Sequence, residues 1–156
     1  MAVQDLYQAL LKTLRREVEL HEHLRTNLMD MQRVLISATL LDIEAKIEEQ
    51  EVLVPTLKQV EESRKVQVVQ IANMLDVSVD ELSLQVIIDQ CDPTLADQLK
   101  EIQAKLRTVV KDIQRLNKNN RILTEHAADF VQKTIEAFFV ATQDTPTYSP
   151  HERNQA

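Results

Sequence analysis

Apolar residues recur along most of the chain at spacings of three and four, the period of an amphipathic helix. One such stretch runs from about Val3 to the mid-thirties, and a second runs from about Thr39 to Leu75. Pro55 lies inside the second stretch and predicts a kink or a break, because a proline within a helix costs about 3 kcal/mol or more. The pattern therefore predicts two long helices in the N-terminal half.

The remaining pattern predicts a short helix and then a very long one. Residues 78–81 read Ser-Val-Asp-Glu, which fits a capping box, and a short helix should follow to about Gln90. Asp92 and Pro93 fit an N-cap and a first-turn proline, so the last helix should run from there to about Thr142. Fifty helical residues span about 75 Å, which a globule of this size cannot contain. We therefore expect an all-α, elongated antiparallel bundle or coiled coil, with one short helix near 79–90.

We expect residues 1–143 to form a single elongated helical domain. Residues 144–156 are polar and contain prolines, so they predict a disordered tail.

The last predicted helix carries a heptad seam with apolar a and d positions. The a positions are Leu99, Leu106 and Ile113, and the d positions are Leu95, Ile102, Val109 and Leu116. The next a position is Asn120, with Asn117 at the flanking e position. A single Asn at an a position tends to fix register and partner number at a cost in stability.

Beyond Asn120 the seam changes. Three successive steps of four behave like a stutter, which locally unwinds a coiled coil. The new stripe consists of Leu123, Ala127, Val131, Ile135 and Phe138, with Phe130 beside it. Two interpretations stay open: a helix end buried against the protein's own helices, or a stripe for a partner helix.

Composition narrows the classes of function. The 156 residues include no glycine, which makes β-hairpins and glycine-rich phosphate loops very improbable. The net charge is -7, and residues 1–92 carry 9 Lys and Arg against 17 Asp and Glu. An acidic body disfavours nucleic acid as a partner. Cys91 is the single cysteine, which fits a reducing compartment, and no stretch has the length or polarity of a signal peptide or a membrane span.

Few residues suggest catalytic or metal chemistry. His21 and His23 are two residues apart, so on a helix they point in different directions and do not form a metal pair. Serine, cysteine and histidine show no nucleophile signature. We therefore expect no enzymatic activity, no cofactor and no metal.

Residues 71–82 resemble a helix-turn-helix corner, with Ile71, Ala72 and a turn at Asp76 where that motif has glycine. The helix expected after this turn contains acidic residues and no Lys or Arg. Phosphate contacts need positive charge, so DNA binding is the less favoured reading. The alternative is a Ser N-cap at a helix corner.

The segment from Leu116 to Glu125 resembles the L-N-x-x-N-R-x-L pattern of flagellar export chaperones of the FlgN type. The layout of the helices, Arg64 near the end of the second helix and Tyr148 in the tail also agree with that family. Family members often carry a glycine shortly after this tyrosine, whereas this chain has Ser149-Pro150.

The resemblance implies a cytoplasmic chaperone of the flagellar type III export system. Such a chaperone binds an amphipathic terminal helix of hook–filament junction proteins, prevents their premature assembly and delivers them to the export gate. The implied cargo-binding residues are Leu116, Asn117, Asn120, Leu123, Ala127, Phe130, Val131, Ile135 and Phe138. Tyr148 would contact the membrane protein of the export gate. The hypothesis that Asn120 weakens cargo binding enough for release predicts tighter binding in an Asn120→Leu variant.

A structural coiled-coil adaptor, or a homodimeric scaffold without cargo, remains the competing class. It predicts that the stripe at 123–139 is buried in the isolated protein.

Overall fold

The computed structural model describes residues 2–37 and 40–141, and all regular secondary structure within these residues is helical. The long helices are α1 (Val3–Ser37), α2 (Leu40–Leu75) and α4 (Pro93–Ala141). A one-turn 3-10 helix, η1 (Val79–Glu81), and a short helix, α3 (Leu84–Gln90), connect α2 to α4. The prediction of an all-α bundle of long helices is confirmed.

Helix α2 continues through Pro55 without a break. Proline removes the hydrogen bond to the carbonyl of Glu51, one turn earlier. Both Pro55 and Glu51 are exposed, so water can solvate that carbonyl. The side chain of Thr56 also bonds the carbonyl of Val52 at 2.8 Å. Pro55 therefore does not break α2, because the carbonyl that loses its hydrogen bond faces solvent.

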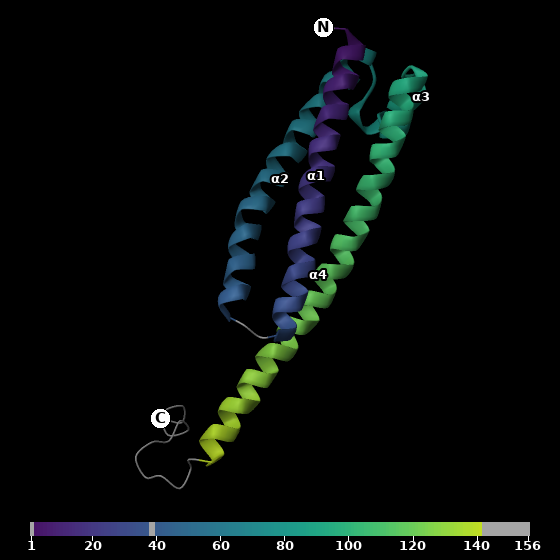
Figure 1. Cartoon of the computed structure of the whole chain (residues 1–156). Helices are drawn as coiled ribbons and strands as arrows, with labels where there is room; N and C mark the ends of the chain where they lie inside the picture. The colour runs from purple at the N-terminus through teal and green to yellow at the C-terminus, as the bar shows by residue number, and fades with distance from the viewer. Residues whose placement is uncertain (1, 38–39, 142–156) are drawn as a thin grey trace.

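Helix α1 is the centre of the assembly, with α2 packed along one side and α4 along another (Figure 1). Helices α1 and α2 run antiparallel, while α1 and α4 run parallel. Two contacts set the parallel register: Arg25 with Asp112, and the carbonyl of Leu28 with Asn120. Helix α4 extends well past the end of the α1–α2 pair (Figure 1).

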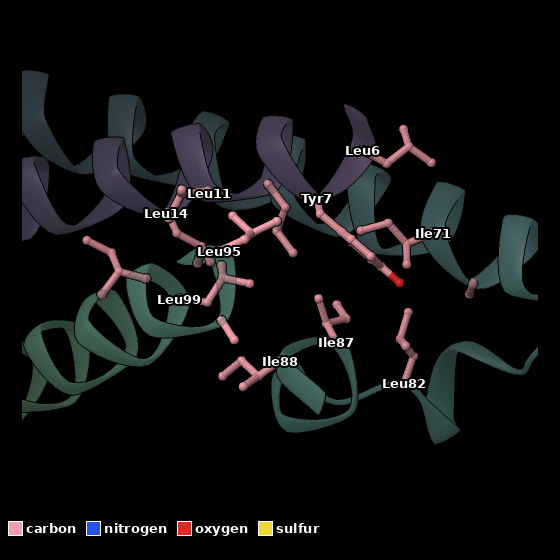
Figure 2. Packing of buried hydrophobic residues seen from close by; sticks show 14 of the residues in the cluster. Leu6, Tyr7, Leu11, Leu14, Ile71, Leu82, Ile87, Ile88, Leu95 and Leu99 are labelled. Atoms are coloured by element: carbon pink, nitrogen blue, oxygen red, sulfur yellow. The ribbon is translucent and has the colours of Figure 1, made fainter. Parts of the chain in front are cut away.

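The larger core lies at the end of the bundle where α3 sits. Leucines of α1 meet the end of α2, Leu82 just after η1, α3 and the first turns of α4, as Figure 2 shows. Tyr7 is almost fully buried there, and its hydroxyl donates to the Gln90 side chain at 3.4 Å. Burial raises the pKa of Tyr7. A second, smaller cluster joins α1 to the middle of α4 through Leu28, Val109, Ile113 and Leu116.

The corner after α2 is built without glycine. Asp76 has a φ of 55°, the left-handed conformation that glycine usually supplies. The Val77 amide bonds the Ala72 carbonyl at 3.0 Å, and the Asp76 amide bonds the Asn73 carbonyl at 3.3 Å. This pair of bonds is a Schellman motif. Asp76 therefore ends α2 in the position that a C-terminal glycine takes in other helices.

The predicted helix starts are found, with one displacement. The Ser78 hydroxyl accepts from the Asp80 amide, but the helix that begins there is only η1. Helix α3 starts later, where the Ser83 hydroxyl accepts from the Val86 amide. The predicted single helix near 79–90 is therefore two short pieces, each with its own serine cap.

The N-cap of α4 is found as predicted. The Asp92 carboxylate accepts from the Leu95 amide at 3.0 Å, so α4 begins with Pro93 in its first turn.

Candidate protein-binding surface on α4

The first half of α4 uses its heptad seam to pack against the rest of the protein. Six of the seven a and d side chains between residues 95 and 116 are buried, and Leu106 is partly buried. The predicted seam is therefore a real packing face, and α1 and α3 are the main helices that cover it. Its members are Leu95, Leu99, Ile102, Leu106, Val109, Ile113 and Leu116.

Asn120 occupies the next seam position and is also buried. Its amide Nδ2 donates to the backbone carbonyl of Leu28 at 3.0 Å, while its Oδ1 has no hydrogen-bond partner among the described residues. A buried carbonyl oxygen without a donor is destabilising. The bond to Leu28 nevertheless fixes how α4 slides along α1, which is the role that an Asn at a seam position predicts. Asn117, one turn earlier, is exposed.

The contact between Asn120 and Leu28 also shows where α4 begins to extend past the end of α1. The two residues are 92 positions apart in the sequence. Because α1 and α4 are parallel, Ser37 at the end of α1 is level with about residue 129 of α4. The last 12 residues of α4, about 18 Å of helix, therefore extend beyond the end of α1.

Apart from Ile122, the exposed large apolar residues of α4 lie past this point. Leu123 and Ala127 lie alongside the end of α1 and are half-buried. Phe130 is 70 % exposed and Val131 is 55 % exposed, and both lie past it. Ile135 and Phe138 are likewise exposed. We call this set the distal stripe: Leu123, Ala127, Phe130, Val131, Ile135 and Phe138.

The distal stripe continues the face of α4 that packs on α1. Leu123 and Phe130 keep the d register of the buried seam, and the other members lie on the same side of the helix. Phe138 contacts Phe139 edge-to-face, with ring centroids 5.8 Å apart. Charged and amide side chains, among them Glu125, Asp129 and Gln132, occupy the other side and are exposed. This arrangement is an amphipathic helix whose apolar face is presented to solvent.

The sequence comparison agrees with this architecture. A model of the FlgN protein family matches residues 1–156, the whole chain. The chain belongs to the FlgN family. Membership assigns it the general role of a flagellar export chaperone, a protein that binds other proteins. No curated protein and no solved structure matches the chain significantly.

The predicted cargo-binding residues of this FlgN-family chain lie on both sides of the point where α4 extends past α1. Leu116 and Asn120 face α1 and are buried in this conformation. Leu123 is half-buried, and the remaining predicted cargo-binding residues of α4 are exposed apart from the half-buried Ala127. Tyr148 lies outside the described residues. The conformation seen here therefore presents Asn117 and the part of the predicted surface that starts at Leu123.

Sequence reasoning missed the polar contacts that join α1 to α2 in this FlgN-family chain. Glu17 is buried, and its Oε1 accepts from the Nε of Arg64. Further along, the Asn27 amide group donates to the Glu49 carboxylate at 2.8 Å and accepts from Gln50 at 2.7 Å. The bond from Asn27 lowers the pKa of Glu49. Glu, Asn and Gln look like solvated residues in a sequence, so no signal distinguished these.

Other candidate residues have structural explanations. His21 is buried with Nδ1 2.7 Å from the Glu17 carbonyl, and His23 is exposed, so the two rings point in different directions, as their spacing predicted. The Cys91 thiol is partly buried, and burial raises its pKa. The described residues contain no cluster of three or more His, Cys, Asp and Glu side chains suited to a metal.

The corner that resembles a helix-turn-helix motif is also part of the core. Ile87 and Ile88 of α3 are buried in the cluster shown in Figure 2.

No helix in the described ranges, 2–37 and 40–141, combines the length and the apolar character needed to cross a bilayer.

Proposed function

We propose that the distal stripe of α4 binds an amphipathic terminal helix of hook–filament junction proteins and keeps them from assembling before export. The observation that supports this proposal is the exposed continuation of the α4 seam beyond the end of α1. From Leu123 to Phe138 the stripe covers about four helical turns, a length that suits one partner helix packed along it.

The physical reasoning is the same as for a helix in a groove. Phe130, Val131 and Ile135 are large apolar residues in contact with water, and burying each would contribute on the order of 1 kcal/mol or more. A cargo segment with its own apolar face has the same excess of exposed apolar surface. Association covers both faces, which stabilises the complex and removes the surface through which the cargo would polymerise.

The proposed surface starts at Leu123 and keeps Asn117 as a flanking polar residue. Leu116 and Asn120 lie outside the proposed surface and hold α4 in place on α1. Delivery to the export gate, a contact between Tyr148 and a gate membrane protein, action in the cytoplasm and the absence of catalysis complete the proposal. They rest on the family resemblance alone.

Two neighbouring residues offer a matched pair of variants. Val131→Asp puts a charge in the distal stripe, and Gln132→Asp puts the same charge on the opposite, solvent side of the same turn. Val131→Asp should weaken binding of a cargo terminal-helix peptide in calorimetry by about a hundredfold, because a carboxylate would be buried without a partner. Gln132→Asp should bind as the parent protein does. Equal binding by the parent and Val131→Asp would remove the distal stripe as the cargo surface.

A homodimeric scaffold is the alternative that this pair also tests. Sedimentation velocity should show that the isolated protein is a monomer. Hydrogen exchange should show that its amides at 123–139 exchange rapidly with solvent. A stable dimer that Val131→Asp converts to a monomer, with strong protection of these amides in the parent protein, would instead assign the stripe to self-association.

A further inference from the structure

The side of α4 opposite the seam carries a row of cations. Between residues 100 and 121, six Lys and Arg side chains occupy b, c and f positions of the heptad, which point away from α1. All six are exposed. We call this row the basic face: Lys100, Arg107, Lys111, Arg115, Lys118 and Arg121.

The basic face is not neutralised by the surrounding structure. Arg115 has Asp112 at 3.8 Å, but the other five form no ion pair with any acidic side chain in the described part of the chain. Glu101 is the one acidic residue on the same side within this segment, and it pairs with Lys105. In a protein of net charge -7, such a concentration of positive charge on one face is unexpected.

The shape of the basic face fits a flat, anionic surface. It is a straight row about 32 Å long on one rigid helix. The residues between the cations are Ala104, Thr108 and Gln114, so the face lacks the apolar or aromatic centre of a stable protein interface. It also lacks aromatic residues on which single-stranded nucleic acid could stack. A duplex groove would place phosphates on both flanks of the helix, and one of these flanks carries the acidic Glu101 and Asp112.

The acidic part of the protein does not oppose such a contact strongly. Twelve of the 25 acidic residues belong to α1 and α2, and the seven on α2 lie beyond α1 as seen from the basic face (Figure 1). Two helix-to-helix distances of 8–10 Å separate α2 from α4. This separation of roughly 20 Å exceeds the Debye length of about 10 Å at 0.1 M salt.

We propose that the basic face of α4 holds this protein against the anionic headgroups of a membrane surface. The contact is electrostatic and peripheral, without insertion of any helix. Because the basic face and the distal stripe lie on opposite sides of α4, the proposal is independent of cargo binding. A membrane-bound molecule would keep the distal stripe accessible.

Vesicle sedimentation tests the proposal with two triple variants of equal charge change. The first replaces Arg107, Lys111 and Lys118 with Gln. The control replaces exposed cations outside α4, through Lys12→Gln, Arg15→Gln and Lys58→Gln. Glutamine is a good helix former, so circular dichroism should show unchanged helix content in both.

The full-length protein should sediment with vesicles of phosphatidylglycerol and phosphatidylcholine at about 50 mM salt, and not at about 500 mM salt. It should not sediment with phosphatidylcholine alone. The basic-face variant should lose on the order of a hundredfold in partition coefficient, while the control variant should stay within a few-fold of the parent.

Several outcomes would overturn the proposal. The parent protein would fail to bind anionic vesicles at low salt, or the two triple variants would bind equally. Loss of vesicle binding in Val131→Asp would assign the membrane contact to the distal stripe instead. Salt-sensitive binding to a homopolymer RNA without vesicle binding would assign the basic face to nucleic acid.

Discussion

Replacing Arg64 with Ala tests the polar contact on which the α1–α2 pair depends. Helix α2 has 36 residues, yet only Leu57, Ile71 and Ala72 are buried in it. Helix α2 therefore contributes few fully buried apolar side chains to the pair, which the bond between Arg64 and Glu17 also joins. The Glu17 side chain is 2 % exposed and that of Arg64 is 35 % exposed. Arg64→Ala would leave a buried carboxylate without its partner.

The expected loss is large for a single surface-accessible residue. Removing one partner of a buried ion pair typically costs about 3–5 kcal/mol. Because a third of Arg64 is exposed, water can partly replace it, so we expect the lower end, about 3 kcal/mol. For a chain of this length each kcal/mol lowers the melting temperature by about 2–4 °C. The variant should therefore melt roughly 6–12 °C below the parent protein.

Thermal unfolding followed by circular dichroism measures this effect, and Arg33→Ala is the matched control. Arg33 also pairs with a carboxylate, Asp30, but its side chain is 75 % exposed, so its removal should cost less than about 1 kcal/mol. Replacing Glu17 and Arg64 together with Met should restore most of the stability, because a well-packed apolar pair removes the buried charge. If Arg64→Ala melts no lower than Arg33→Ala, the Glu17 carboxylate is not isolated by the substitution and the reasoning is wrong.

Three further predictions follow from individual contacts. Asp76→Gly should raise the free energy of unfolding by about 1 kcal/mol in a urea titration, because glycine adopts the left-handed conformation without cost, and an Asp76→Ala control should show no gain. Asn120→Asp should lower it by about 3 kcal/mol by burying a charge, whereas Asn120→Leu should be neutral or stabilising because it removes the unpaired Oδ1. The pKa of Glu49 is lowered in the folded protein by Asn27 and Lys46 from its usual 4.5, so its contribution is present above that value and is lost as the pH falls through the lowered pKa. The parent protein should therefore lose more stability than Glu49→Gln between about pH 5 and pH 3, and equal losses would contradict the assignment.

The bounds of the long helices and the α4 seam could be predicted from the sequence because local rules determine them. The three-and-four spacing of Leu95, Leu99 and Ile102 needs only helical geometry, and all three are buried. Asp92 before Pro93 starts α4 as a cap should. These features depend on residues within one or two turns of each other. Periodicity and capping rules are therefore sufficient for them.

Features that depend on which helix faces which were not predictable in the same way. Heptad spacing places Asn120 on the seam, but it does not show that this residue bonds the Leu28 carbonyl of α1, 92 residues away. Glu17 and Arg64 are 47 residues apart and meet only because α1 and α2 pair in one register. Helix α3 begins after its N-cap Ser83, directly after Leu82 enters the core. The capping pattern at Ser78 therefore did not predict where α3 begins.

The distal stripe illustrates the limit of a sequence pattern most directly. Its apolar spacing is compatible with burial against the protein's own helices and with exposure to a partner. In a single chain the bond between Asn120 and Leu28 distinguishes burial from exposure. It fixes the register of α4 on α1, and in that register α1 ends level with residue 129. Phe130 and Val131 are the first large apolar residues past that level, and both are exposed. The distal stripe is thus exposed because α4 is longer than α1. The buried amide of Asn120 fixes the point at which α1 stops packing against α4.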